Sequence, residues 1–327
     1  MSERCITCGS DSLEKVRPYR TKTAHGKDLF DGQWLCECSE CGLVQTIPAP
    51  SLQALSDYYA VDYRDKCCAG CDVSDSNRFP KDNLFYYNRG QSIADLVKPF
   101  VKTDTPEILD IGAGWGHILY AMGERFPNGR RTAIEFSQVC VKHLQGMGIE
   151  VHTDAADIIL PKMDRQFDVV VISHVFEHLL TPYEILKLVR ERLAPDGVLY
   201  IEVPNIPQES LLKYPDHIWA PRFDQPHITF FSLDTLRSIL ERAGFAPEIC
   251  DTAGPEYKYI SAWRFNTPSL RWLAQDLMPK AVFDFLRNQK VTNAVRVQDR
   301  EESFYQYGGF RIWLLRISGL ADGNRDG

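Results

Sequence analysis

Four side chains in the second half of the chain have the chemistry to take and give protons. His174, Glu177 and His178 are spaced i, i+3 and i+4, so a helical turn would bring all three to one face. A carboxylate beside an imidazole fixes the tautomer of the ring and keeps it ready to titrate near neutral pH. We therefore expect His178 to act as a general base, with Glu177 orienting it. His227, which follows a proline, is the second acid–base candidate, and the alternative is a purely structural His–Glu pair.

Cysteines are concentrated at the start of the chain, where eight of the ten precede residue 72. Cys5 and Cys8 form one CxxC pair, and Cys38 and Cys41 form a second, each followed by a glycine that permits a tight turn. Four thiolates at this spacing are typical of a closed tetrahedral Zn²⁺ site, which stabilises a small fold and does no chemistry. The pattern predicts a zinc ribbon with structural Zn²⁺ over residues 1–60.

The other cysteines are less informative. Cys36 could replace Cys38 as a ligand, but the repeated spacing favours Cys38. A second metal completed by Cys36 or His25 is an alternative to a metal-free loop for the group Cys67, Cys68 and Cys71. Cys140 and Cys250 are expected to be small buried apolar residues.

A glycine-rich turn after an apolar run indicates a ligand site. The chain passes from that run into Gly112-x-Gly114-x-Gly116 and then into a helical pattern. Glycines let the backbone turn sharply and let a ligand approach where a Cβ would clash. Asp110 can accept hydrogen bonds from the turn or from a cationic ligand. Glu135, about 20 residues further on, can bind both ribose hydroxyls of an adenosine.

From about residue 107, short apolar runs alternate with helical patterns, which predicts a doubly wound, Rossmann-like α/β sheet covered on both faces. A helix is expected from Pro182, with a capping box of Thr181 and Glu184 and an end at 195–197; another is expected after Ser232, ending at Gly244. Strands are expected at Glu107–Ile111, Arg131–Glu135, Phe167–Ser173, Gly197–Val203 and Gly309–Ile317.

The GxGxG spacing with an acid before it suits a ligand that carries positive charge, whereas dinucleotide folds prefer GxGxxG facing a pyrophosphate. At this point the sequence resembles the class I S-adenosylmethionine (SAM)-dependent methyltransferases over residues 85–250. The N-terminal zinc ribbon adds a similarity to zinc-ribbon methyltransferases that act on sugars. The resemblance rests on four segments: Leu109–Gly116, Ala133–Phe136, Phe167–Leu179 and Pro226–Ser232.

The resemblance implies SAM as cofactor and a role for each matching residue. The three glycines would cradle the methionine part, and Glu135 would bind the ribose. Phe136 would border the adenine, and Asp154 and Ala155 would contact its edge. Beneath the sulfonium would lie Ser173 and His174. Tyr86 and Tyr87, before the first strand, would cover the ligand or, equally, pack a leading helix.

The resemblance also implies a reaction: O-methylation of a hydroxyl of a sugar, glycan or related small metabolite, with His178 as candidate general base. C-methylation of a nucleotide-linked keto sugar is the alternative, disfavoured because only 77 residues follow residue 250. From other classes, a nicotinamide-dependent oxidoreductase and a non-catalytic SAM-binding or zinc scaffold protein are alternatives. Quinone-pathway O-methyltransferases carry a metal-binding Glu-x2-Glu-His motif; His174 replaces its first Glu here, which leaves a His/Glu/His metal site as a lesser alternative.

Charge and hydropathy restrict the partners. A net charge of −7 over 327 residues argues against nucleic acid as the main partner, because phosphate backbones bind basic surfaces. The chain shows neither a signal-peptide pattern nor a run of about 18 apolar residues, so we expect a cytoplasmic protein without a transmembrane segment.

The predicted domain organisation has three parts: the zinc ribbon at 1–60, a linker and leading helix at 61–104, and the methyltransferase domain at 105–327. The ribbon has no basic face and is expected to contact a partner or cover the substrate. A helical, basic and aromatic insertion is expected at 258–308, before the last strand. Residues 258–300 hold eight Lys/Arg against three Asp/Glu. Besides simple packing, that segment is hypothesised to recognise a phosphorylated or glycan acceptor or to rest on an anionic membrane surface.

Overall fold

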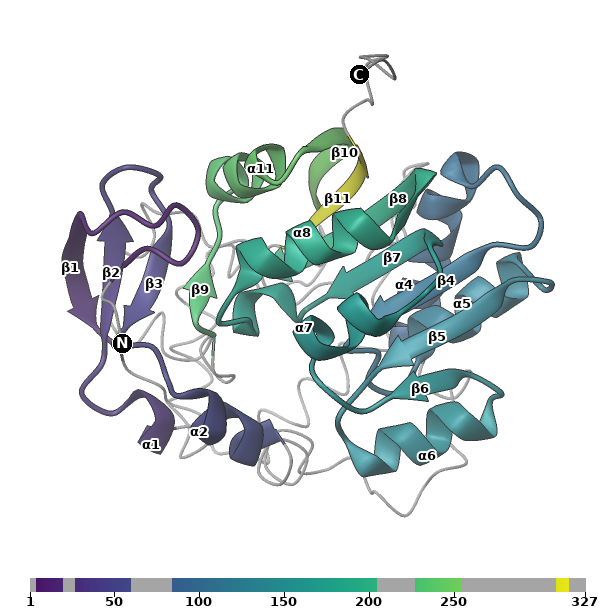
Figure 1. Cartoon of the computed structure of the whole chain (residues 1–327), viewed down its shortest axis with the longest axis horizontal. Helices are drawn as coiled ribbons and strands as arrows, with labels where there is room; N and C mark the ends of the chain where they lie inside the picture. Colours follow the sequence, from purple (N-terminus) through teal and green to yellow (C-terminus); the bar gives the residue numbers. More distant parts are fainter. Residues whose placement is uncertain (1–3, 20–26, 60–83, 205–226, 254–309, 318–327) are drawn as a thin grey trace, which may run out of the picture.

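The structure is a computed structural model that describes residues 4–19, 27–59, 84–204, 227–253 and 310–317. A large sheet with helices on both sides forms the main body, and a smaller N-terminal sheet lies beside it (Figure 1). The predicted insertion at 258–308 and the residues His25, Cys67, Cys68 and Cys71 lie outside the described residues.

The main sheet has seven strands in the order β10-β11-β8-β7-β4-β5-β6. The five strands from β8 to β6 run parallel, and β11 is antiparallel to β8 and to β10. The prediction of an α/β fold with a parallel central sheet is confirmed. The strands are β4 (Glu107–Ile111), β5 (Arg130–Ile134), β6 (Glu150–His152), β7 (Phe167–Ser173), β8 (Leu193–Pro204), β10 (Phe245–Ala253) and β11 (Phe310–Ile317).

Both faces of the central strands are buried, because successive side chains alternate between two apolar cores. Val169 and Val171 point into one core, whereas Val170 and Ile172 point into the other, and all four are fully inaccessible to solvent. A continuous apolar run in the sequence therefore marks a strand that is covered on both faces. The strands predicted at Glu107–Ile111 and Phe167–Ser173 are of this kind.

Helices complete each core. One core takes apolar side chains from α4 (Leu84–Val97), α5 (His117–Arg125) and α6 (Gln138–Gly146). The other takes them from α7 (Ala156–Ile159), α8 (Pro182–Arg192) and α11 (Leu233–Arg242). Single 3₁₀ turns extend or connect these elements: η2 (Lys98–Phe100), η3 (Leu160–Lys162) and η4 (Phe176–His178).

The second sheet has four antiparallel strands in the order β1-β2-β3-β9. Its first three strands belong to residues 4–19 and 27–59, which we call the N-terminal unit, whereas β9 follows β8 of the main sheet in the chain (Figure 1). This pairing joins parts of the chain that were predicted as separate domains. The elements are β1 (Leu13–Pro18), α1 (Lys27–Phe30), β2 (Trp34–Cys38), β3 (Val44–Ile47), α2 (Leu52–Asp57) and β9 (Thr229–Phe230).

The capping box predicted before Pro182 is wrong. Thr181 is the N-cap of α8, but its side chain accepts no hydrogen bond from the helix, and its φ of −132° and ψ of 57° are not the extended conformation that such a cap needs. Glu184 instead forms an ion pair with Lys187, Oε2 to Nζ 2.6 Å. Ser232 does cap α11, where it forms a box with Thr235.

Several strand boundaries differ from the prediction. β5 spans Arg130–Ile134, so Glu135 lies just after the strand and not in it. β8 begins at Leu193, so residues 195–197 lie within the strand and α8 ends at Arg192. β11 spans Phe310–Ile317, and Gly309, the predicted first residue, lies outside the described residues. β6 and β10 were not predicted, because a three-residue strand and a strand containing Pro247 carry little local signal.

The turn after β4 offers a test of the backbone argument. Gly112 has a φ of 77°, and an added Cβ would lie 2.2 Å from Cγ2 of Val175. We expect Gly112→Ala to lower the free energy of unfolding by about 2–5 kcal/mol through backbone strain and overlap. The measurement is a urea titration, with Gly146→Ala as control because nothing lies within 4 Å of an added Cβ there. Equal unfolding midpoints for the two variants would contradict the argument.

Candidate functional site

The glycine turn after β4 is bound to the next strand. Its three glycines all lie in the left-handed region, with φ of 77° at Gly112, 54° at Gly114 and 76° at Gly116. The Gly112 N–H donates to the carbonyl of Ile134 at 2.8 Å, and Gly116 is the N-cap of α5. The turn therefore needs glycine for its conformation and is fixed at the carboxyl ends of β4 and β5.

Asp110, the last acid before this turn, lies at the bottom of it. The residue is 2% exposed, and its Oδ2 has no hydrogen-bond partner among the described residues. Burial raises the pKa of the Asp110 carboxyl to about 7. Because buried polar atoms normally have a partner, an unpaired oxygen here fits a ligand that brings a donor or a positive charge.

The other residues predicted to bind a nucleoside lie at the same sheet edge. The Glu135 carboxylate accepts from the N–H of Gly114 and from the N–H of Ser137, both at 2.8 Å, so it already braces the turn. Phe136 is 48% exposed. Asp154 is exposed and Ala155, the N-cap of α7, is half-buried after β6. The structure thus gathers the predicted ligand residues at the ends of β4, β5 and β6.

Tyr86 and Tyr87 pack the leading helix against α5. The Tyr86 ring stacks on His117 with centroids 4.7 Å apart, and the Tyr87 hydroxyl donates to Glu124 Oε2 at 3.3 Å. These contacts fit the helix-packing alternative, and Tyr86 is 44% exposed.

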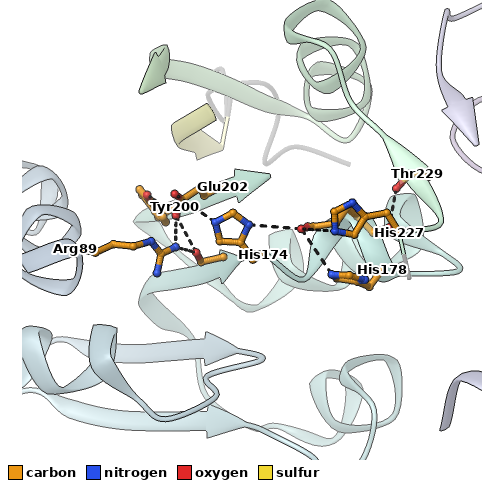
Figure 2. A network of polar contacts seen from close by, with 9 residues as sticks. Arg89, His174, His178, Tyr200, Glu202, His227 and Thr229 are labelled. Atoms are coloured by element: carbon orange, nitrogen blue, oxygen red, sulfur yellow. Dashed lines mark hydrogen bonds and ion pairs between the residues drawn. The ribbon is translucent and has the colours of Figure 1, made fainter. Parts of the chain in front are cut away.

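A second group of polar side chains meets after β7. Oε1 of Glu177 lies 3.6 Å from Nδ1 of His174, 3.7 Å from Nε2 of His178 and 3.9 Å from Nε2 of His227 (Figure 2). The rings of His178 and His227 are 4.8 Å apart, edge to face. The structure therefore brings the four predicted residues together. They do not share one helical face, however, because His174 has a φ of 55° and precedes η4.

Glu177 is the centre of this group. It is 2% exposed, and neither carboxylate oxygen has a hydrogen-bond partner among the described residues. His227 is 6% exposed, and its Nδ1 is likewise without a partner there. Imidazoles converge on this carboxylate without reaching hydrogen-bond distance, so the group is arranged to receive a further atom between them.

A buried network continues from His174 to the leading helix. His174 Nε2 lies 3.6 Å from Oε1 of Glu202, whose Oε2 accepts from Ser173 at 2.8 Å and from Tyr200 at 3.2 Å (Figure 2). Arg89 forms an ion pair with Glu202 and also donates to Ser173. His174 consequently stands between two buried carboxylates, and Ser173, predicted to lie beneath a sulfonium, is bound within this network.

The charges in this network stabilise one another. Burial alone would lower the pKa of His174, but Glu202 and Glu177 raise it to about 9. Burial opposes ionisation of Glu177, but His174 and His178 lower its pKa to about 2. The Arg89 charge likewise keeps the pKa of Glu202 well below its usual range despite burial. Burial lowers the pKa of His227 to about 3, so this ring is neutral at pH 7.

The four predicted cysteine ligands form a compact cluster in the N-terminal unit. The Sγ atoms of Cys5 and Cys41 are 3.5 Å apart, as are those of Cys8 and Cys38, and all four lie within 4.8 Å of one another. A tetrahedral Zn²⁺ with Zn–S bonds of about 2.3 Å separates its sulfurs by about 3.8 Å, so the cluster fits this ion. Cys36 lies outside the cluster.

A carboxylate and two imidazoles also make a donor set for a divalent cation. Glu177, His178 and His227 each offer an atom within 4.8 Å of the others. The metal site considered from the sequence consists instead of His174, Glu177 and His178. The same atoms thus meet the requirements of proton transfer and of metal binding.

Comparison with known families decides the class of the main domain. The model of a methyltransferase domain family matches residues 85–248, just over half of the chain. The chain belongs to this family. Residues 85–248 are accordingly a class I SAM-dependent methyltransferase domain, and they contain both the glycine turn and the Glu177 group.

Individual relatives of the methyltransferase domain are distant. The malonyl-[acyl-carrier protein] O-methyltransferase of Geobacter sulfurreducens is 30% identical over 160 residues, covering 46% of this chain and 60% of that protein. The (S)-coclaurine N-methyltransferase of Thalictrum flavum subsp. glaucum is 28% identical over 106 residues, covering 30% and 29%. The chain thus spans less than two thirds of the length of these curated relatives. Among solved structures, the plantazolicin methyltransferase BamL in complex with an analog and SAH aligns with a TM-score of 0.45 and 15% identity over 82% of this chain and 99% of that one.

Some residues of the methyltransferase domain's buried network were missed by the sequence analysis. Glu202 interrupts an apolar strand, and a charge in such a setting is a signal of a buried partner. Arg89 lies in a helix between Asn88 and Gly90 and carries no such signal. Nothing local, however, shows that Arg89 and Glu202, 113 positions apart, pair with each other.

None of the described helices is long and apolar enough to cross a membrane.

The raised pKa of His174 predicts how stability depends on pH. The folded pKa of about 9 exceeds the ordinary 6.5, so the stabilisation is complete below pH 6.5 and is lost as the pH rises through about 9. We expect the unfolding free energy to fall between about pH 7 and about pH 9 in the wild type and to fall less in His174→Asn. Asn is chosen because it tolerates a positive φ. Urea titrations at several pH values measure both slopes, and parallel slopes would contradict the assignment.

Proposed function

We propose that this chain transfers the methyl group of SAM to a hydroxyl of a small metabolite such as a sugar or glycan. The observation that carries the proposal is the buried Glu177 carboxylate with His178 and His227 converging on it, one turn beyond the strand end where the SAM sulfonium is expected. Substrates of open α/β sheets bind at this edge.

Residues at the ends of β4, β5 and β6 would hold SAM. Asp110 offers a buried oxygen without a partner among the described residues, and the three glycines of the turn have no side chains to block a ligand. Glu135, beside the turn, would bind the ribose. Phe136, Asp154 and Ala155 would contact the adenine. Ser173 ends the neighbouring strand β7 and His174 follows it, where the resemblance puts the sulfonium. When bound, SAM supplies a carbon already activated for displacement by its sulfonium.

The Glu177 group would then serve the acceptor. His178 takes the hydroxyl proton as the oxygen forms its bond to the methyl carbon, and the carbon–sulfur bond breaks in line with it. Glu177, kept ionised by the imidazoles around it, orients His178 and stabilises the imidazolium that forms. His227, neutral at pH 7, binds the acceptor hydroxyl and fixes its direction.

O-methylation and the acceptor class are supported by different observations. The Geobacter relative is named an O-methyltransferase, whereas the Thalictrum relative is named an N-methyltransferase. Neither name concerns a sugar, so the sugar acceptor stands on the resemblance in sequence alone. An imidazole base beside the Glu177 carboxylate suits removal of the weakly acidic proton of a hydroxyl.

Isotope-labelled SAM tests the reaction. We expect label to appear on the oxygen of an acceptor from a panel of sugars, glycans and phenols, and turnover to fall about 10²–10⁴-fold in His178→Gln. SAM affinity, measured by calorimetry, should not change. His152→Gln is the matched control, because that ring pairs with Glu150 on the surface. Label on carbon would favour C-methylation, and full turnover without His178 would refute its role as base.

We also propose that Cys5, Cys8, Cys38 and Cys41 bind a structural Zn²⁺. The sulfur separations fit the ion, and the N–H groups of Gly9 and Gly42 close the two turns by donating to Cys5 and Cys38 carbonyls at 2.8 Å.

Metal analysis tests this second proposal. The wild type should contain about one equivalent of Zn²⁺, which Cys8→Ser should lose together with part of the thermal stability. Cys36→Ser should keep the metal, because its sulfur lies outside the cluster. Retention of zinc by Cys8→Ser, or its loss from Cys36→Ser, would refute the ligand set.

A further inference from the structure

His227 is attached directly to the sheet of the N-terminal unit. It immediately precedes Ile228 and β9, and β9 pairs with β3, with Thr229 opposite Gln45 and Phe230 opposite Val44. The Thr46 N–H adds a hydrogen bond to the Ile228 carbonyl at 2.9 Å. One imidazole of the proposed active site is therefore placed by strands that lie about 180 positions earlier in the sequence.

The same short segment is bound from the other side by the loop that carries Glu177. The Ile228 N–H donates to the Glu177 carbonyl at 2.9 Å. The Thr229 hydroxyl donates to the same carbonyl at 3.2 Å (Figure 2). A continuous chain of hydrogen bonds thus runs from Thr46 through Ile228 to Glu177. Any shift of β3 relative to β9 changes the position of His227 with respect to the carboxylate.

Gln45 joins this chain to the first cysteine pair. Its side chain is 1% exposed; its Oε1 accepts from the Ile6 N–H at 2.9 Å, and its Nε2 donates to the Arg4 carbonyl at 3.0 Å. Ile6 lies between Cys5 and Cys8, so the amide fixes the first CxxC turn to the strand that pairs with β9.

Apolar contacts continue the same connection. Tyr19 of the N-terminal unit stacks on Phe30 and lies 6.1 Å, centroid to centroid, from Phe230 in β9. Cys5 and Cys38 belong to the core that contains Phe176, the neighbour of Glu177. In addition, the Tyr59 ring meets the His178 ring edge-on at 6.0 Å. The N-terminal unit consequently contacts the His178 ring through Tyr59, pairs with the strand that follows His227, and shares the core of the main domain.

We infer that the N-terminal unit is a positioning element of the active site, in which Gln45 and Thr46 fix β9 so that His227 faces Glu177. The inference rests on the proposed function for its catalytic consequence. It gives the cysteine cluster a defined task, because the CxxC turn bound by Gln45 keeps β3 in place. The unit is thus part of the acceptor side of the site and more than a separate module for partners.

The inference predicts a division between acceptor and cofactor sides. None of the contacts described for Gln45 and Thr46 reaches Asp110, the glycine turn or Glu135, which lie on β4 and β5. Disturbing β3 should therefore lower the rate of methyl transfer while leaving SAM binding intact. A merely structural role would affect both or neither.

The experiment uses Gln45→Leu in the full chain, with Gln53→Leu as matched control because Gln53 is exposed and its Nε2 donates to the Asp57 carboxylate at 2.8 Å. We expect kcat to fall about 10- to 100-fold, since an error of about 1 Å in position has an effect of that size. The Kd for SAM should stay within about twofold of the wild type. The control should match the wild type in both.

A spectroscopic readout separates this inference from the proposed function. The imidazole signals of His227, assigned in ¹⁵N-histidine-labelled protein with His227→Gln, should move in Gln45→Leu and stay in place in Gln53→Leu. That result supports the positioning role even if no acceptor is methylated. Unmoved His227 signals in folded Gln45→Leu, or unchanged kcat, would overturn it.

A second variant guards against loss of folding in Gln45→Leu. Thr46→Val keeps the shape and the backbone bond but removes the hydroxyl that lies 3.5 Å from the Ile228 carbonyl. It should shift the same His227 signals by a smaller amount. Signals identical to the wild type in Thr46→Val, if Gln45→Leu does not fold, would count against the inference.

Discussion

The structure of the site depends on keeping one carboxylate ionised inside the protein. Glu177 is 2% exposed, and burying a charge without partners costs several kcal/mol. The imidazoles of His174 and His178 offset this cost, and the neutral ring of His227 lies beside them; the three come from a strand end, a 3₁₀ turn and a distant segment. Because no single element supplies them all, the sheet, the turn and the N-terminal unit must assemble before the carboxylate is stable.

A second buried carboxylate extends this requirement to the leading helix. Glu202 is bound by Arg89, Ser173 and Tyr200, and it shares His174 with Glu177. The imidazolium between them attracts both carboxylates, and His174 has a left-handed φ of 55° that non-glycine residues rarely adopt. The strain is tolerated because the surrounding charges fix the ring.

The parts of the fold that local chemistry determines could be predicted from the sequence, and the rest could not. The apolar runs of β4 and β7, the glycine turn and the two CxxC pairs are each specified by neighbouring residues. The placement of His227 against Glu177 and the partnership of Arg89 with Glu202 depend on pairing over long sequence distances, which periodicity does not encode. Local prediction can also fail, as at Thr181, because a residue type that is common at caps does not ensure the backbone angles that a cap needs.

The two halves of the site differ in the same way: one is specified by local sequence and the other by pairing between distant segments. The proposed cofactor half, at Asp110, the glycine turn and Glu135, is built from one continuous stretch, so neighbouring residues specify its geometry. The acceptor half joins η4 to β9 and through it to Gln45, and its geometry depends on contacts between distant segments. On the proposed function, this division lets residues on the acceptor side change without disturbing the turn that would bind the methyl donor.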